Sequence, residues 1–385
     1  MNITSPHGAT PAVGDVTILD GVKIVEITTA VSAPLIGRVL AEMGAEVVKV
    51  ESRAKVDVNR ARVPRPTDPE GYPAHEAFQL LHEASASKES VTLNMKTDEG
   101  RRLFLELLSD ADVFIENFVP GWLDRLGLPI EQLRERFPRL IIFSASGYGQ
   151  TGPLRTQRSY APVMTALAGI EGLIGYEDGQ VMGCSALALA DLNCSFNGVF
   201  LVMAALAGRE TTGQGTHIDL SQIEAVSTLA GEVFVEQQLT GAIPGPVGNQ
   251  DPNGTRWSLA HASERDTWLA ARETPAGAAQ PDSRPDRADL LKTLREKGIE
   301  AAAVLTPEQV VADERFAERG YTQTVEHPHP AIGTLTITSV PWRVEGTVPR
   351  VRRPAPMIGA GNSKILGRYA DTANLTELEN QGVLK

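Results

Sequence analysis

The chain has 385 residues, a formal net charge of −12 at pH 7, 42% hydrophobic residues and 22% charged residues. This length favours two domains with sizeable cores, and the composition excludes disorder for most of the chain. The acidic balance argues against a nucleic-acid groove, because phosphate backbones are bound by clustered lysines and arginines.

The N-terminal part of the chain predicts a strand–helix–strand unit. The stretch "VKIVEIT" (22–28) is typical of a buried strand. A short helix is expected to open at Pro34 and to end at Gly44, since proline suits a first turn and glycine suits a C-cap. The next strand is expected at "EVVKVE" (46–51).

The same alternation continues downstream. Further strands are expected at 90–95, 112–117 and 139–147, with a helix over 97–111. Strands that alternate with helices at this spacing indicate an α/β protein with a parallel, doubly wound, Rossmann-like sheet. The first strand-to-helix loop, "TTAVSAP", lacks the dinucleotide fingerprint G-x-G-x-x-G, and no G-x-x-x-x-G-K-S/T occurs. Nicotinamide, flavin and ATP-type sites therefore lose support.

A long apolar run at 190–210 carries one carboxylate, Asp191, at its front edge. The run predicts a helix that is buried on nearly all sides. Aspartate is a preferred N-cap residue, so residue preferences alone favour a capping role for Asp191. The same position would also hold a carboxylate rigidly at the edge of a cleft, as a nucleophile requires. The apolar stripe of the helix consists of Leu192, Phe196, Val199, Met203 and Leu206.

The composition changes from about residue 245, where a Pro/Gly-rich junction begins. We predict a large domain over 1–230, completed by 331–385, and a small domain with linkers over 231–330. The segment 274–286 is typical of an exposed linker.

Other features exclude several kinds of site. The two cysteines, Cys184 and Cys194, cannot build a disulfide framework and match no zinc spacing, so we predict buried thiols and a cytoplasmic protein. His327 and His329 form an i, i+2 pair in a Pro-rich loop, which is more typical of solvated histidines than of metal ligands, so no metal is assigned. The N-terminus lacks a basic, apolar leader and no stretch reaches the roughly 20 apolar residues of a membrane span, so no membrane association is expected.

Several spaced segments together resemble the class III CoA-transferases, also called the CaiB/BaiF family. The resemblance covers about residues 17–250 strongly and about 290–358 more weakly. It implies an interlocked dimer with a Rossmann-like large domain and a small domain, which is shorter here than is usual for the family. The segments are "LDGVKIVEITTAVSAPLIGRVLAEMGAEVVKVE", "TLNMKTDEGR", "VFIENFVPGWLDRLGL", "SASGYGQTGP" and "ALADLNCSFNGVFLVMAALAGRETTGQGTHIDLS".

The resemblance implies an acyl-CoA:carboxylate CoA-transferase in which Asp191 is the catalytic nucleophile. Coenzyme A and acyl-CoA would be substrates, a small carboxylic acid the acceptor, and no cofactor would be tightly bound. The reaction would pass through an aspartyl anhydride and an aspartyl–CoA thioester. Tyr148 and Gln150 would lie near the acyl group. The residues that match the CoA site are Thr29, Ala30, Val31, Ser32, Ser52, Arg53, Lys88, Asn117, Phe118 and Arg125.

Two departures from the family pattern keep alternatives open. The racemase branch pairs a histidine with an aspartate in the stretch that reads "RSYAPVM" here, and Tyr160 stands in place of that histidine. A phenol is a poor general base at pH 7, so an acyl-CoA racemase or isomerase is disfavoured. The shortened region around 271–291 favours an alternative in which the chain is a mainly structural subunit of a hetero-oligomeric transferase. A homodimer is expected, and a heterodimer with a homologue stays open, as do the donor and acceptor acids.

Overall fold

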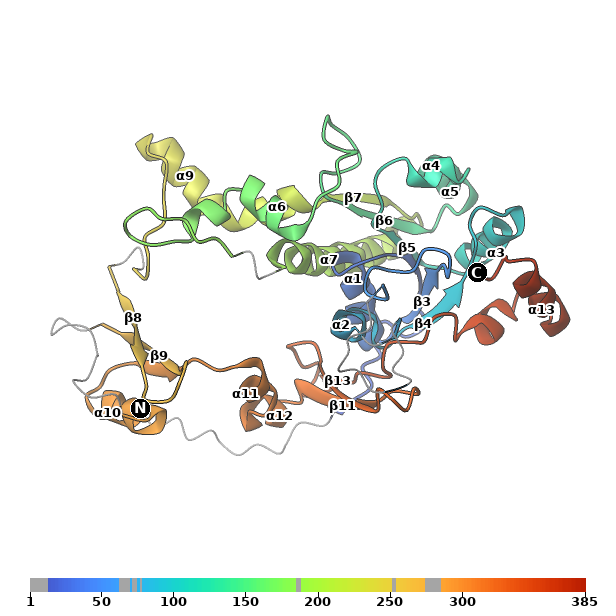
Figure 1. Ribbon diagram of the computed structural model, residues 1–385. Helices are drawn as coiled ribbons and strands as arrows, with labels where there is room; N and C mark the ends of the chain where they lie inside the picture. Colours follow the sequence, from blue (N-terminus) through green and yellow to red (C-terminus); the bar gives the residue numbers. More distant parts are fainter. Residues whose placement is uncertain are drawn as a thin grey trace. The chain divides into compact units, whose positions relative to one another are not determined.

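The computed structural model describes residues 13–61, 70, 75–76, 78–184, 188–250, 254–273 and 285–385. The chain forms two compact units, and Figure 1 labels their helices and strands. Each unit has its own hydrophobic core. The first, here named the sheet unit, comprises Met1–Thr165, Ala188–Thr228 and Glu314–Lys385. The second unit comprises Ala166–Leu187 and Leu229–Asp313.

A six-stranded parallel sheet, in the order β4-β3-β2-β5-β6-β7, organises the sheet unit and confirms the predicted fold class. The chain moves outward from β2 through β3 to β4, then returns to β5 and moves outward the other way to β7. The loops after β2 and β5 therefore meet at the switch point, where open α/β sheets bind their ligands. The strands are β2 (Lys23–Ile27), β3 (Glu46–Glu51), β4 (Glu89–Thr92), β5 (Val113–Glu116), β6 (Ile141–Ser146) and β7 (His217–Ser221).

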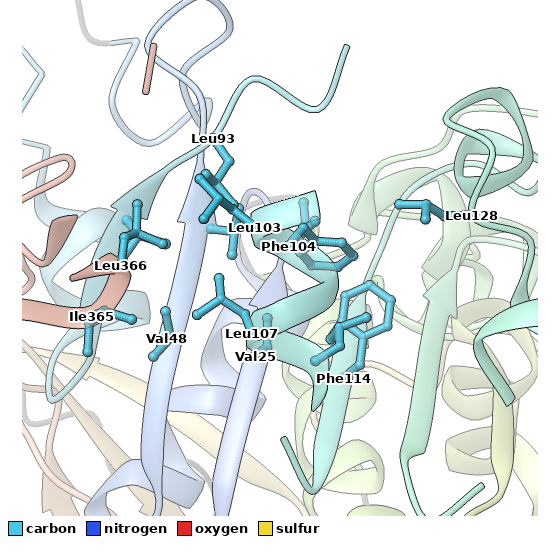
Figure 2. Packing of buried hydrophobic residues seen from close by; sticks show 14 of the residues in the cluster. Val25, Val48, Leu93, Leu103, Phe104, Leu107, Phe114, Leu128, Ile365 and Leu366 are labelled. Carbon is cyan, nitrogen blue, oxygen red and sulfur yellow. The ribbon is translucent and has the colours of Figure 1, made fainter. Parts of the chain in front are cut away.

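Helices cover both faces of this sheet, so the strands other than the edge strand β7 consist almost entirely of buried residues. On one face, α1 and α7 pack around a core that includes Ile36, Phe143 and Val202. On the other face lies α3, and Figure 2 shows its Phe104 beside Phe114 of β5, with ring centroids 5.4 Å apart. The helices are α1 (Ser32–Glu42), α2 (Gln79–Ser85), α3 (Asp98–Ser109), α4 (Trp122–Arg125), α5 (Ile130–Arg136), α6 (Ala161–Leu167, which continues into the second unit), α7 (Leu189–Thr212), α8 (Gln222–Ser227), α12 (Glu314–Glu318) and α13 (Thr372–Asn380).

Small sheets complete both units. In the sheet unit, β1 (Val13–Gly14) pairs with β13 (Val348–Pro349), and β11 (Thr322–Glu326) forms a hairpin with β12 (Thr334–Thr338). The second unit has an antiparallel sheet in the order β10-β9-β8, on which α10 packs with Leu290 and Leu294. Its elements are α9 (Gly231–Thr240), β8 (Trp257–His261), β9 (Trp268–Arg272), α10 (Arg287–Glu296), β10 (Ala301–Ala303) and α11 (Pro307–Val311). Short 3₁₀ and π turns lie at Glu171–Leu173, Thr228–Ala230 and Asn362–Leu366.

The compact units differ from the expected domain boundaries in two places. Residues 166–187, expected in the large domain, belong to the second unit, where the Glu177 carboxylate lies 2.5 Å from the Arg256 guanidinium. Residues 314–330, expected in the small domain, belong to the sheet unit. There the β11–β12 hairpin buries Ile337 in a small core cluster. Both differences arise from long-range side-chain contacts, which changes in composition along the chain do not reveal.

One face of α7 lies open, which corrects the prediction of burial on nearly all sides. Gly198 faces α1, and a Cβ at this position would overlap Ile36, so the two helices pack closely. The opposite side exposes Leu192, Phe196 and Phe200 to 42%, 46% and 69%. By length and composition alone α7 would also suffice to cross a membrane, contrary to the sequence expectation. Because α7 packs against α1, α8 and β6, we interpret it as a core helix with one largely exposed apolar face, on which Phe196 meets the ring of Trp342 edge-on.

Candidate active site

Asp191 lies in the first turn of α7 rather than at its N-cap. The helix begins at Leu189, and the N-cap residue Ala188 makes no side-chain capping bond. The predicted capping role of Asp191 is therefore wrong, because the helix begins before Asp191. A carboxylate in the first turn still interacts favourably with the positive end of the helix dipole.

Ser32, the first residue of α1, is the side chain whose hydroxyl acts on the pKa of the Asp191 carboxyl. Ser32 is only 2% exposed, and Gln222 of α8 donates from Nε2 to Ser32 Oγ at 3.1 Å. Ser195, one turn after Asp191, has its Oγ 2.7 Å from the backbone oxygens of both Ser32 and Asp191. Burial raises the pKa of Asp191 above its ordinary value, and the hydrogen bond from Ser32 offsets part of this rise. Helices α1, α7 and α8 thus hold one carboxylate in a defined position.

Side-chain hydrogen bonds hold the loop after β2 at the switch point of the sheet. Thr29 N donates to Asn117 Oδ1, and Asn117 Nδ2 donates to Thr29 O, both at 2.9 Å. Ala30 has a φ of 65°, in the left-handed region that residues other than glycine rarely adopt. Asp57 Oδ1 accepts from Ala30 N at 3.1 Å and from Thr29 Oγ1 at 3.2 Å. The structure therefore brings the predicted residues Thr29, Ala30, Val31 and Asn117 together, directly before Ser32.

The residues predicted after β3 and β5 lie at the carboxyl edge of the sheet. Ser52 and Arg53 follow β3 and donate to backbone oxygens of the C-terminal segment, at 3.3 Å and 3.0 Å. Phe118 follows β5 and stacks on Trp122, with ring centroids 4.2 Å apart and ring planes 17° apart. Arg125 ends α4 and is exposed. Polar, aromatic and cationic groups thus gather where parallel sheets bind ligands.

Tyr148 and Gln150 lie in the turn after β6. The backbone N–H of Gln150 is 3.0 Å from both carboxylate oxygens of Asp219. Gly147 O accepts from Ile223 N at 3.1 Å, so this turn adjoins the start of α8. Because the first residue of α8 contacts Ser32, the turn lies near the Asp191 cluster.

A family model described as CoA-transferase family III matches residues 19–281 and 282–362. The chain belongs to CoA-transferase family III. It is 34% identical to an acetyl-CoA:oxalate CoA-transferase of Acetobacter aceti over 249 residues, which are 64% of this chain and 61% of that relative. It is 27% identical to a succinate–glutarate CoA-transferase of Agrobacterium fabrum over 385 aligned positions, covering 90% of this chain and 94% of that relative. A crystal structure of a CaiB/BaiF family protein from Brucella suis matches with a TM-score of 0.81 and 26% identity, covering 92% of this chain and 100% of that one.

For this CoA-transferase family III chain, the predicted contact between Lys88 and a phosphate needs correction. Lys88 is fully buried, and its Nζ donates to Glu26 Oε1 at 2.7 Å and to Pro34 O at 2.5 Å. Burial lowers the pKa of Lys88 to about 8. A phosphate could reach this amine only if the interior bonds broke. Lys88 precedes β4, whereas the exposed Lys96 follows β4 at the ligand edge.

Lys96 and Glu116 also lie at the carboxyl ends of strands of the sheet, and they were not among the residues predicted from the sequence. Lys96 occurs in the segment "TLNMKTDEG", directly after a predicted strand. This position could have indicated that Lys96 lies at the edge of the sheet where ligands bind. Glu116 ends the buried strand β5, and its Oε2 accepts from Phe118 N at 2.9 Å. Burial raises the pKa of Glu116 to about 7, against the opposing hydrogen bonds from Ser144 and Phe118 N. The sequence feature that could have indicated Glu116 is a single acidic residue at the end of the apolar strand "VFIEN".

Of the two histidines considered from the sequence, His327 belongs to the interior of the sheet unit and His329 is half-buried. His327 is buried, and its ring meets the ring of His82 edge-on, with centroids 5.2 Å apart. This burial corrects the expectation of a solvated histidine. Within the ranges that the structure describes, no group of three or more His, Cys, Asp or Glu side chains could hold a metal ion.

Proposed function

We propose that this protein transfers CoA from an acyl-CoA donor to a carboxylic acid acceptor, with Asp191 as the nucleophile. The observation that carries the proposal is the carboxylate itself. It lies in the first turn of α7, where Ser195 Oγ is 2.7 Å from the backbone oxygens of both Asp191 and Ser32, at the end of the switch-point loop. No salt bridge joins it to a cation among the described residues, so its charge is available for attack on a carbonyl carbon.

The proposed reaction transfers CoA in successive steps, in which the thioester carbonyl of the donor and then the carbonyl of Asp191 are attacked. An Asp191 oxygen attacks the thioester carbonyl of the donor, and the CoA thiolate leaves with the electron pair of the broken C–S bond. The thiolate then attacks the aspartyl carbonyl of the resulting anhydride, releasing the donor acid and forming an aspartyl–CoA thioester. The acceptor carboxylate attacks this thioester, and the thiolate then takes the acceptor acyl group, which frees Asp191.

We place CoA along the carboxyl edge of β2, β3, β4 and β5. The exposed cations Arg53, Lys96 and Arg125 follow three of these strands and suit the CoA phosphates. The stacked rings of Phe118 and Trp122 offer an apolar face beside them. The backbone groups of the loop at 29–31 would adjoin the thioester end, because this loop leads directly into Ser32.

We also propose a homodimer, in which a second copy covers the exposed face of α7. Leu192, Phe196 and Phe200 form an apolar face on a helix that is otherwise packed. Burial of such a face stabilises an association by about 25 cal/mol for each Å² removed from water. Light scattering tests this assignment, and a monodisperse monomer that binds acyl-CoA would favour the alternative of a subunit that needs a homologous partner.

Mass spectrometry of the intact protein after incubation with a panel of acyl-CoAs tests the function. Hydroxylamine quenching should convert an activated aspartyl group to a hydroxamate, which peptide mapping should place at Asp191. Asp191→Asn should give no hydroxamate and should lower turnover by about 10⁴-fold or more. Asp20→Asn, an exposed aspartate of the sheet unit, serves as the matched control.

The outcomes separate the candidate functions. A hydroxamate at Asp191 supports the proposed transferase and identifies a usable donor. Bound acyl-CoA without any adduct would contradict covalent catalysis by the isolated chain. Exchange of the α-proton of the acyl group with solvent deuterium, without CoA transfer, would instead indicate a racemase or isomerase.

A further inference from the structure

Both backbone polar groups of Ala30 are bound by a turn that lies 27 to 29 positions further along the chain. Asp57 Oδ1 accepts from Ala30 N at 3.1 Å, and Asn59 Nδ2 donates to Ala30 O at 2.5 Å. Asp57 and Asn59 are only 8% and 3% exposed, so these bonds compete little with water. Residues 57–59, which we name the loop clamp, therefore fix the two peptide groups that flank the Cα atom of Ala30.

Ala30 needs such support because its backbone conformation is unfavourable. Its φ of 65° lies in the left-handed region, where the Cβ atom of any residue other than glycine crowds the following carbonyl oxygen. The next residue, Val31, has a φ of −119° and a ψ of −55°, so it is back in the right-handed region. The reversal at Ala30 thus turns the chain from β2 into α1. Without the loop clamp, Ala30 would leave this conformation for one of lower energy.

The loop clamp is anchored in the interior of the sheet unit and not on the loop that it holds. Lys49 Nζ of β3 lies 3.0 Å from Asp57 Oδ2, and it donates to Thr28 O at 2.7 Å. The residue after the clamp, Arg60, is fully buried and donates from Nε to Glu51 Oε1 at 2.8 Å. All of these bonds are made within the protein, so the geometry of the loop is preorganised.

We propose that Asp57 and Asn59 are positioning residues for acyl-CoA binding, which act by holding Ala30 in the left-handed conformation. This inference rests on the proposed function, in which the loop at 29–31 adjoins the thioester end of CoA. The two clamp residues are themselves buried, so they act on the substrate only through the loop.

A preformed loop strengthens substrate binding in a way that can be measured. When the loop is already ordered, binding does not include the entropic cost of ordering it, so the affinity is higher. The loop contacts the substrate both before and during the reaction, and the clamp therefore contributes to affinity more than to the rate of the chemical steps. Its loss should raise the KM for acyl-CoA with little change in kcat.

The test measures the Kd for coenzyme A itself by isothermal titration calorimetry, because this measurement requires no knowledge of the acyl group. Asn59→Ala removes the bond to Ala30 O and should raise the Kd by about tenfold, as expected for one hydrogen bond. Adding Ala30→Gly to Asn59→Ala should bring the Kd back to within about threefold of the wild type, because glycine adopts a positive φ without the steric cost. Gln323→Ala is the matched control and should leave the Kd unchanged. Gln323 of β11 likewise uses its side-chain amide to bind a backbone oxygen, Pro349 O, at 2.9 Å.

The outcomes separate this inference from the proposed function. An unchanged Kd in folded Asn59→Ala would overturn the inference alone, and so would a raised Kd that Ala30→Gly does not reduce. If Asn59→Ala fails to fold by circular dichroism, Thr29→Val decides in its place, because it removes the bond from Thr29 Oγ1 to Asp57 Oδ1. Its Kd should rise about threefold and return toward the wild-type value when Ala30→Gly is added, which loss of a direct contact with CoA would not allow. Failure of the wild-type protein to bind coenzyme A would contradict the proposed function, and the inference with it.

Discussion

In the sheet unit, some buried carboxylates are paired with lysines, whereas the half-buried Asp191 carboxylate is not. Glu26 and Asp57 belong to what we name the interior ion cluster, together with Lys49 and Lys88. Lys49 Nζ lies 3.0 Å from Asp57 Oδ2, and Lys88 Nζ lies 2.7 Å from Glu26 Oε1. Asp191, by contrast, has no ion pair within the described residues, and the neutral Ser32 hydroxyl is the side chain that lowers its pKa against the effect of burial.

This difference separates structural carboxylates from the carboxylate that we propose as the nucleophile. In the interior ion cluster, burial opposes the charged form, yet Lys49 and backbone N–H groups hold the pKa of Asp57 below its ordinary value. Such a carboxylate is tightly bound and positions the loop at Thr29 and Ala30. A neutral hydroxyl leaves most of the charge on Asp191, so that carboxylate can act as a nucleophile.

The largest stability effect should come from breaking the interior ion cluster. Lys49→Met should lower the free energy of unfolding by about 3–5 kcal/mol, because it leaves buried carboxylates without their cation. Thermal and urea unfolding measure this change. Asp191→Asn removes a carboxylate outside the cluster and should change the free energy of unfolding by less than about 1 kcal/mol. Equal destabilisation by the two variants would contradict the view that the lysine-paired carboxylates are structural and that Asp191 is not.

Glu116 offers an intermediate case, a buried carboxylate without a lysine partner among the described residues. Burial raises its pKa from 4.5 to about 7, so between these values the folded protein binds more protons than the unfolded chain. Stability from this group is therefore greatest below pH 4.5 and falls as the pH rises to about 7. The total change is at most about 3.5 kcal/mol, since one pKa unit corresponds to about 1.4 kcal/mol.

The measurement is the difference in unfolding free energy between the wild type and Glu116→Gln across this pH window. Glutamine keeps the shape without titrating, so the advantage of the wild type should shrink as the pH rises. A difference that is constant between pH 4.5 and 7 would contradict the raised pKa.

The smallest expected effect concerns the exposed cations at the ligand edge. Lys96→Ala should raise the KM for the acyl-CoA by about fivefold with little change in kcat, as expected for one exposed contact with a phosphate. Higher ionic strength should reduce this difference. Arg319→Ala, at an exposed position of the sheet unit, is the control. An unchanged KM in Lys96→Ala would remove Lys96 from the CoA site.

The local patterns of the sequence determined the strands, the parallel sheet and the long apolar helix, because these depend on periodicity over a few residues. The strand predicted at 46–51 is β3, and the helix predicted over 97–111 is α3 at Asp98–Ser109. The resemblance to the CoA-transferases supplied Asp191, since several motifs occur in the family's order. The roles of side chains within those elements were less predictable. Lys88 was expected to contact CoA, but in the fold it is fully buried.

Only the tertiary structure decided what surrounds Asp191 and which face of α7 is buried. Ser32 and Gln222 are 190 positions apart in the chain, yet they meet behind one carboxylate because α1 and α8 both pack against α7. Local periodicity carries no information about such contacts. The apolar composition of α7 likewise specified a helix but not its neighbours, so the exposure of Phe200 followed from how the elements pack and not from their hydrophobicity.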